Sequence, residues 1–149
     1  DARAWYPGDP MRRVQHSVQI DAPIEAVVLL VGAFDLFADF HPQVASCDVD
    51  GDGEGATRTL WLADGQEIEE RLVEELSNGY VYEGTAPSSN MAAWRGRIEV
   101  EARGEHSTVT WTLEVDPAHG VDDAVLVART QGMLEEGLGS AKRQLEGLD

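Results

Sequence analysis

The chain has 149 residues, of which 42% are hydrophobic, and this is enough for one domain with its own apolar core. It carries 28 acidic and 11 basic residues, for a formal net charge of -17 at pH 7. Such a charge repels phosphate groups, so we expect no nucleic acid partner and no anionic membrane surface. It could instead attract a cationic ligand, but a solvated acidic surface is the simpler explanation.

The single cysteine, Cys47, excludes an internal disulfide and a cysteine-rich metal cluster. No apolar run reaches the roughly 20 residues that a bilayer-spanning helix needs, so we expect no membrane insertion. The first residues lack the basic and apolar zones of a secretory signal, and we expect a cytoplasmic location, although the chain does not begin with Met. Nothing in the sequence indicates an oligomeric state.

The chain begins with a Pro- and Gly-rich segment, Trp5 to Pro10, which predicts a loop within an N-terminal extension of residues 1–10. Apolar residues then alternate with polar ones from Val14 to Ile20, as in a half-buried strand. Pro23 favours a helix start that runs to about Gly32. A second short helix near 35–40 should end at His41, because Pro42 disfavours helical geometry in the residue before it.

The following part of the chain alternates with period two and is interrupted by Gly-containing turns, which predicts a run of antiparallel strands. The expected strands are Val44–Asp50, Thr57–Leu62, Glu67–Leu76, Tyr80–Glu83, Trp94–Ala102 and Thr108–Val115. From Asp122 onward, apolar residues recur at three- and four-residue steps, which predicts one long C-terminal helix. Gly132, Gly137 and Gly139 would each cost this helix up to about 1 kcal/mol relative to Ala.

Three short motifs lie in the central part: Phe40-His41-Pro42, Gly55-Ala56-Thr57-Arg58 and Glu70-Arg71-Leu72. Their order and spacing resemble the START-like superfamily of polyketide cyclases, dehydrases and lipid-transport proteins. Many members have Trp-His-Pro at the first motif, so this chain keeps an aromatic ring there and loses an indole donor. The resemblance covers about Val14 to Leu145 and implies one START-like domain.

The fold implied is the α+β helix-grip fold, a curved antiparallel sheet of about seven strands around a long C-terminal helix, with two short helices after the first strand. One helix cannot fill the concave face of a strongly bent sheet, so a cavity is expected. Alternation places a mostly apolar set of side chains on that face. The residues expected to contact a ligand are Arg58, Leu60, Ile68, Glu70, Tyr82, Trp94 and Trp111, with His41 beside them. On the strand Val44–Asp50, alternation places Ala45, Cys47 and Val49 inward.

Arg58 and Glu70 are the charged exceptions on this face, and each needs a partner or a water-filled cavity. They could hold a polar group of a ligand, with Glu70 as a general base, or form an ion pair that braces two strands. In the related plant hormone receptors, the equivalent Glu contacts the ligand through water, which supports the ligand-facing alternative for Glu70.

His41 could act as an acid or base on a ligand, but a His that closes the short helix and bonds a loop carbonyl is the favoured alternative. His16 is expected to be a core residue, and Cys47 a core filler rather than a nucleophile. Tyr82, Trp94 and Trp111 could stack a planar ligand or fill the cavity themselves. Two segments, 63–66 and 86–90, correspond to the gate and latch of the hormone receptors but lack their characteristic sequences.

Asp48-x-Asp50-x-Asp52-Gly53 copies the first half of a calcium loop, but the twelfth position is Thr59, which cannot supply the bidentate carboxylate. Zinc, nucleotide and hydrolase motifs are missing, so no metal and no cofactor is expected.

The sequence therefore favours a binding module for a hydrophobic or amphipathic small molecule, such as a lipid, a polyketide-like aromatic compound or a terpenoid. The alternative is a polyketide cyclase, aromatase or dehydrase in which Arg58, Glu70, Tyr82 or His41 polarises a carbonyl or moves a proton. A protein-interaction module is a third class with no motif of its own, and whether the protein is an enzyme stays open.

Overall fold

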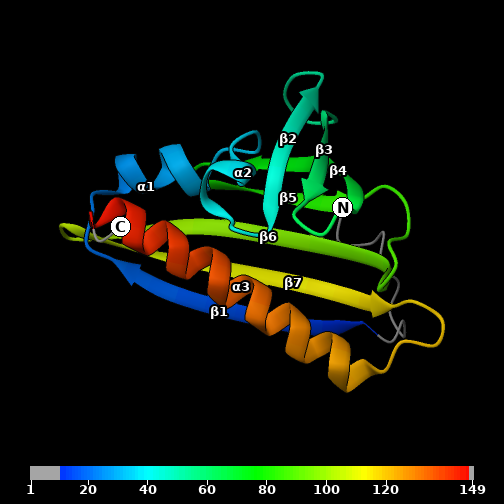
Figure 1. The fold of residues 1–149 in the computed structure, drawn as a ribbon. Coiled ribbons are helices and arrows are strands. Elements are labelled where there is room, and N and C mark those ends of the chain that lie inside the picture. Colours follow the sequence, from blue (N-terminus) through cyan, green and yellow to red (C-terminus); the bar gives the residue numbers. More distant parts are fainter. Residues whose placement is uncertain (1–10, 148–149) are drawn as a thin grey trace.

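The computed structural model describes residues 11–147 and has the predicted α+β helix-grip architecture (Figure 1). The elements in chain order are β1 (Arg12–Ile20), α1 (Ile24–Val31), α2 (Phe37–Phe40), β2 (Val44–Asp50), β3 (Thr57–Leu62), β4 (Glu67–Leu76), β5 (Gly79–Gly84), β6 (Met91–Arg103), β7 (His106–Pro117) and α3 (Asp123–Leu145). The loop predicted at Trp5 to Pro10 lies outside the described residues. None of the described helices is long and apolar enough to cross a membrane.

The seven strands form one antiparallel sheet in the order β1-β7-β6-β5-β4-β3-β2. Strands β2 to β7 are joined as successive neighbours, and the segment that contains α1 and α2 connects β1, at one edge of the sheet beside β7, to β2 at the opposite edge. Figure 1 shows α3 lying along β1 and β7, while β2 and β3 project away from it. The sheet therefore curves around α3, as the resemblance implied.

Both ends of α3 are fastened to the β1 region. At the first turn, the Asp122 side chain accepts a hydrogen bond from Val125 N at 3.1 Å, and Asp123 forms an ion pair with Arg12. At the last turn, Lys142 Nζ donates to the Gln19 carbonyl at 2.6 Å and to Glu146 Oε2 at 2.8 Å. These contacts fix the helix along β1 and leave its middle turns to face the cavity.

The prediction that Ala45 points inward was wrong. Val44 pairs with Leu62, Cys47 with Leu60 and Val49 with Arg58, but the register shifts between Val44 and Ser46. Residues opposite each other in a ladder share a face, so Val44, Cys47 and Val49 lie on the same side, while Ala45 is exposed at the irregularity. Strict alternation cannot detect such an inserted residue.

Candidate functional site

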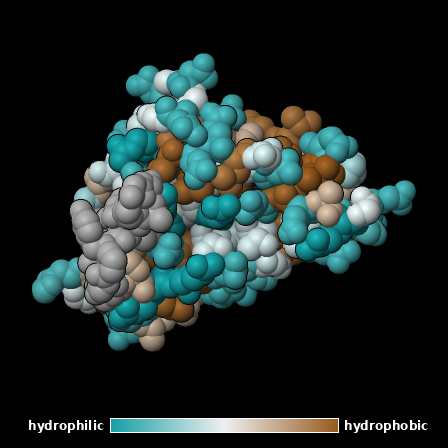
Figure 2. Space-filling view, turned by 180° about the vertical axis from the view of Figure 1, so that it is seen from behind, coloured by the Kyte–Doolittle hydropathy of each residue, from teal (hydrophilic) through white to brown (hydrophobic). Residues whose placement is uncertain are grey.

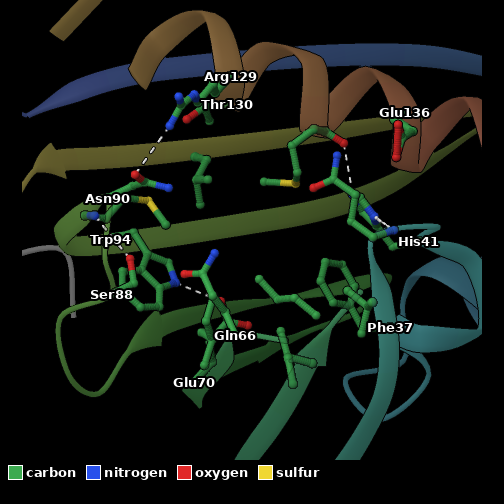
Figure 3. A pocket seen from close by; sticks show the side chains of 18 of the residues that line it. Phe37, His41, Gln66, Glu70, Ser88, Asn90, Trp94, Arg129, Thr130 and Glu136 are labelled. Atoms are coloured by element: carbon green, nitrogen blue, oxygen red, sulfur yellow. Dashed lines mark hydrogen bonds between the residues drawn. The ribbon is translucent and has the colours of Figure 1, made fainter. Parts of the chain in front are cut away.

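A cavity of about 500 Å³ lies between the concave face of the sheet, α2 and α3 (Figure 3). Its wall is largely apolar and aromatic. The apolar lining comprises Phe37, Val44, Leu60, Leu62, Ile68, Tyr82, Met91, Trp94, Trp111, Leu113, Leu126 and Met133. The polar lining comprises His41, Gln43, Asp64, Gln66, Glu70, Ser88, Asn90, Arg129, Thr130 and Glu136, with Gly132 at the surface.

All the residues expected to contact a ligand line this one cavity except Arg58. The Arg58 side chain is 0% exposed and does not line the cavity, so a molecule bound there would contact Glu70 and not Arg58. Arg58 and Glu70 are directly opposite on β3 and β4, which is the brace between adjacent strands that the sequence left as one alternative. Tyr82, Trp94 and Trp111 are buried, yet they leave the cavity open beside them.

Arg58 and Glu70 form a buried ion pair. Arg58 Nε and Nη2 donate to Glu70 Oε1 at 2.9 and 2.8 Å, and Arg58 Nη1 donates to the Phe34 carbonyl at 2.8 Å and to the Tyr80 hydroxyl at 3.0 Å. Burial by itself lowers the pKa of Arg58, but Tyr80 and Glu70 outweigh it, so the pKa lies above its ordinary value. The guanidinium therefore stays charged.

Four aromatic rings surround this guanidinium. Its central carbon lies 4.4 Å from the ring centroid of Phe34, 4.6 Å from Phe37, 4.8 Å from Tyr82 and 5.3 Å from Tyr80. A cation over an aromatic face gains about 0.5–2 kcal/mol, more when it is desolvated. The rings and Glu70 together offset the cost of burying this charge.

Glu70 presents the other half of its carboxylate to the cavity. Trp94 Nε1 donates to Glu70 Oε2 at 2.7 Å, and Figure 3 shows both side chains at the same end of the cavity. A carboxylate has about four acceptor sites, two on each oxygen. Arg58 occupies both sites of Oε1 and Trp94 one site of Oε2. Within residues 11–147, one acceptor site of Oε2 has no donor, and this site is available to a ligand.

Two rings of the wall are seated over glycines of neighbouring strands. A Cβ on Gly96 would lie 2.1 Å from Tyr82 Cζ, and a Cβ on Gly84 would lie 2.5 Å from Trp94 Cε2. Only glycine permits so close an approach of a ring to the backbone, so these two positions set how deeply the rings recede from the cavity.

The Tyr82 hydroxyl accepts a hydrogen bond from Trp111 Nε1 at 3.0 Å, and its own O–H has no acceptor within residues 11–147. Burial, with the Glu70 charge nearby, raises the pKa of Tyr82 well above its ordinary value. The phenol therefore stays protonated and is a hydrogen-bond donor rather than a base. Tyr82 and Glu70 give the cavity one available donor and one available acceptor.

Both ring nitrogens of His41 are engaged by the protein. Gln43 N donates to Nδ1 at 3.1 Å, so Nε2 carries the proton and donates to the Met133 carbonyl at 2.9 Å. Burial lowers the pKa of His41, against the opposing effect of the Met133 hydrogen bond. His41 ends α2, as the favoured alternative expected, but the carbonyl that it bonds is that of Met133 on α3 rather than a loop carbonyl, so the side chain links α2 to α3.

The two segments that correspond to the gate and latch of the hormone receptors, 63–66 and 86–90, contribute residues to the lining of the cavity. Gln66 and Asp64 come from the first, and Ser88 and Asn90 from the second. Ser89 Oγ donates to Gln66 Oε1 at 2.8 Å and joins the two segments, while Arg129 Nη1 on α3 approaches Asn90 Oδ1 at 3.4 Å (Figure 3). The Asp64 carboxylate accepts a hydrogen bond from the Gln66 backbone N–H, and this bond lowers the pKa of Asp64. The carboxylate therefore stays ionised at the mouth of the cavity.

The cavity-facing residues of α3 were missed at the sequence level. Leu126, Thr130 and Met133 recur at four- and three-residue steps, but a threonine interrupts the apolar stripe that was used to find the helix face. The Thr130 hydroxyl donates to the Leu126 carbonyl at 2.8 Å, which satisfies the buried group. The same spacing would have identified these positions had small and weakly polar residues been counted.

No group of three or more His, Cys, Asp and Glu side chains within residues 11–147 could hold a metal ion. The calcium-loop pattern lies in the β2–β3 hairpin, where Asp48 is the direct ladder partner of Thr59. Cys47 is half-buried, and burial raises the pKa of its thiol, which disfavours the reactive thiolate.

A family profile described as polyketide cyclase / dehydrase and lipid transport matches residues 11–146. The chain belongs to this family. Among solved structures, it is similar to a Thermobifida fusca protein with 28% identity, a TM-score of 0.76 and coverage of 92% of this chain and 95% of the other. It also resembles an uncharacterized Bacillus thuringiensis protein with 23% identity, a TM-score of 0.81 and coverage of 91% and 99%.

The fold is shared with a START superfamily protein from Mycobacterium smegmatis, at 14% identity, a TM-score of 0.79 and coverage of 92% of this chain and 99% of that one. A search of curated proteins finds no match to the chain. Family membership therefore identifies the type of fold, and the ligand has to be inferred from the residues that line the cavity.

Proposed function

We propose that the protein binds a neutral, largely apolar small molecule in the cavity, such as a lipid, a polyketide-like aromatic compound or a terpenoid. The observation that carries this proposal is an apolar cavity of about 500 Å³ with one open carboxylate acceptor site, on Glu70. Small-molecule sites commonly measure about 300–1,000 Å³ and combine apolar walls with a few placed polar groups.

The polar groups narrow the class of ligand. Glu70 can only accept, so the ligand group beside it is a donor such as a hydroxyl, and a carboxylate there would be repelled. Tyr82 can donate to the oxygen of the same hydroxyl or to a nearby carbonyl. An alcohol or phenol on an apolar skeleton therefore fits better than a fatty acid.

A cyclase or dehydrase is the second candidate function, because Tyr82 can donate to a carbonyl while Glu70 accepts a proton from the same substrate. Two observations favour binding over catalysis. Arg58 occupies both acceptor sites of Glu70 Oε1 and Trp94 occupies one of Oε2, so a single site is left to take a proton from a substrate. His41 has both nitrogens occupied by the chain.

The experiment is native mass spectrometry of the purified protein followed by thermal shift with farnesol, 2-naphthol and lauric acid. If a probe reaches about 100 times its Kd, it stabilises the protein by about 2.7 kcal/mol, or roughly 5–10 °C in melting temperature. We expect farnesol or 2-naphthol to raise the melting temperature with dose and lauric acid to have a much smaller effect.

Gly132 offers a variant that adds bulk at the wall of the cavity without a clash with the core. It lines the cavity on α3, and a Cβ there meets no atom within 4 Å. Gly132→Leu should abolish the shift, whereas Gly132→Ala, which gives a similar gain in helix propensity with little bulk, should preserve it. No bound mass and no shift with any probe would refute the proposal. Conversion of a bound compound that Glu70→Gln abolishes while binding persists would instead favour the enzyme.

A further inference from the structure

Exposed apolar side chains gather at a second hollow, away from the cavity described above. Within residues 11–147, the exposed large hydrophobic residues are Leu29 at 72%, Val125 at 46% and Val49 at 39%. Val49 lines a hollow of about 530 Å³, and Leu29 lies three residues before Gly32, which lines it too, a spacing that makes the two positions neighbours on the helix surface. Two of these three residues thus border one feature of the surface.

This hollow lies between the end of α1 and the β2–β3 hairpin. Its α1 side consists of Val28, Gly32, Ala33, Phe34 and Asp35. Its opposite side consists of Val49, Gly51, Asp52, Gly53 and Ala56, and the remaining lining residues, from β4 to β5, are Leu72, Glu75, Leu76, Ser77, Gly79 and Tyr80. We call this hollow, together with Leu29, the α1 cleft.

Helix α1 is unusually apolar for a helix at the surface. In its eight residues, IEAVVLLV, the charged residue is Glu25. Val27 and Val31 are buried, three further apolar residues pack partly buried against the core, and Leu29 is exposed. A surface helix normally turns a polar face to water, and a helix that is apolar all round is normally covered. Figure 2 shows an apolar patch at the upper right, where the turned view places α1. Such a patch commonly marks an interaction site.

The edges of the α1 cleft are acidic. Asp35, Asp52 and Glu75 line it and are exposed, and Glu54 is held beside Glu75 by a hydrogen bond from the Glu75 backbone N–H at 3.0 Å. The described residues that line it include no Lys or Arg. The exposed apolar side chains of Leu29 and Val49, beside these carboxylates, are complementary to apolar side chains flanked by basic ones.

The shape and charge select among possible occupants. Leu29 stands outside the hollow and is 72% exposed, so an occupant that covers both is longer than a compact small molecule. A second copy of this chain would bring the same acidic edge and a net charge of -17 toward its own kind. A basic segment of another protein is long enough to cover both Leu29 and the hollow, and its charge is attracted rather than repelled.

We propose that the α1 cleft is a docking site for a basic amphipathic segment of another protein, whose apolar side chains cover Leu29 and Val49 and whose Lys or Arg side chains face Asp35, Asp52 and Glu75. This function is independent of the ligand proposed for the cavity. The two hollows share one wall, since Arg58 is hydrogen bonded to Phe34 and Tyr80 of the cleft and to Glu70 of the cavity.

The test is a titration of the isotope-labelled protein with a 14-residue amphipathic Leu/Lys peptide, followed by backbone amide chemical shifts. A Leu/Glu peptide with the same pattern is the control for charge. We expect the Leu/Lys peptide to shift the amides of Ile24–Val31 and of the β2–β3 hairpin, and the Leu/Glu peptide to shift neither. Asp52→Asn or Glu75→Gln should weaken binding about two- to fivefold at low salt.

Leu29→Asp separates docking from general attraction to an acidic protein. The substitution adds negative charge, so attraction alone predicts tighter binding, whereas docking predicts a loss of about tenfold or more. Val125→Asp, at the other exposed hydrophobic residue, is the matched control and should not weaken binding. Equal binding by Leu29→Asp, or shifts confined to other surfaces, would overturn the proposal. So would a homodimer in sedimentation equilibrium that Leu29→Asp dissociates, because the occupant would then be a second copy.

Discussion

Arg58 places two N–H groups on a single carboxylate oxygen of Glu70, at 2.9 and 2.8 Å, and so divides that carboxylate into a structural half and a half that faces the cavity. The structural half braces β3 against β4, and the other half is held by Trp94 Nε1 at 2.7 Å. One residue therefore serves both the stability of the sheet and the polarity of the cavity.

This division predicts strong coupling between the two residues in a double-mutant cycle. Arg58→Met leaves a buried carboxylate without its cation, and Glu70→Leu leaves a buried guanidinium, so each should lower the free energy of unfolding by about 3–5 kcal/mol. The double variant should lose at least about 2 kcal/mol less than the sum, because neither charge is then left alone. Urea denaturation measures all four proteins, and additive losses would show that the pair is not coupled.

Gly137 is predicted to be required for the contact between α3 and His41. A Cβ at position 137 would lie 2.5 Å from His41 Cδ2 and 3.1 Å from Trp111 Cζ3, and both side chains are buried. Gly137→Ala should therefore destabilise the protein by about 1–3 kcal/mol, although Ala is the better helix former.

The matched control in the same helix is Gly139→Ala. A Cβ there meets Arg143 Nη1 at 3.5 Å, an ordinary contact with the end of a flexible side chain. This variant should be neutral or stabilise by up to about 1 kcal/mol. Thermal unfolding compares the two, and a stabilised Gly137→Ala would contradict the proposed packing.

The sequence predicted the fold well because alternation, turn residues and helical periodicity are local patterns. Every expected strand and helix within residues 11–147 is present, and the START-like resemblance is supported by the family match. The cavity wall was harder to predict. Alternation identifies the face on which Arg58 lies but not its depth, so it could not distinguish a residue behind Glu70 from one beside a ligand. The irregularity at Ala45 reversed the face of one residue, and Thr130 obscured the cavity side of α3.

The His41 geometry predicts a specific loss of stability in mild acid. Because burial lowers the pKa of His41 in the folded protein, the unfolded chain takes up a proton at higher pH than the folded one. The contribution of neutral His41 is thus fully present above the ordinary pKa of about 6.5 and is lost as the pH falls below it.

His41→Gln tests this dependence, because the Gln amide can still donate to the Met133 carbonyl but does not titrate. The difference in free energy of unfolding between the wild type and His41→Gln should favour the wild type most at pH 8 and shrink toward pH 5. His16→Gln provides the control for histidine loss in general. A difference that stays constant with pH would mean that His41 is protonated equally in both states.

The buried tyrosines predict a second loss of stability, in alkali. Burial raises the pKa of both Tyr80 and Tyr82 in the folded protein, whereas a tyrosine in the unfolded chain has a pKa of about 10. The folded state therefore keeps its phenolic protons while the unfolded state releases them, so stability is fully present below pH 10 and falls as the pH rises further. Tyr82→Phe removes one of these groups and should reduce the slope of unfolding free energy between pH 10 and pH 11. At pH 7 the same variant should lower the free energy of unfolding by about 1–3 kcal/mol. The reason is that Trp111 Nε1 then loses the Tyr82 hydroxyl, its hydrogen-bond acceptor at 3.0 Å. An unchanged alkaline slope in Tyr82→Phe, measured by urea denaturation, would show that this phenol ionises as readily in the folded protein as in the unfolded chain, and it could not then serve as the donor proposed for the cavity.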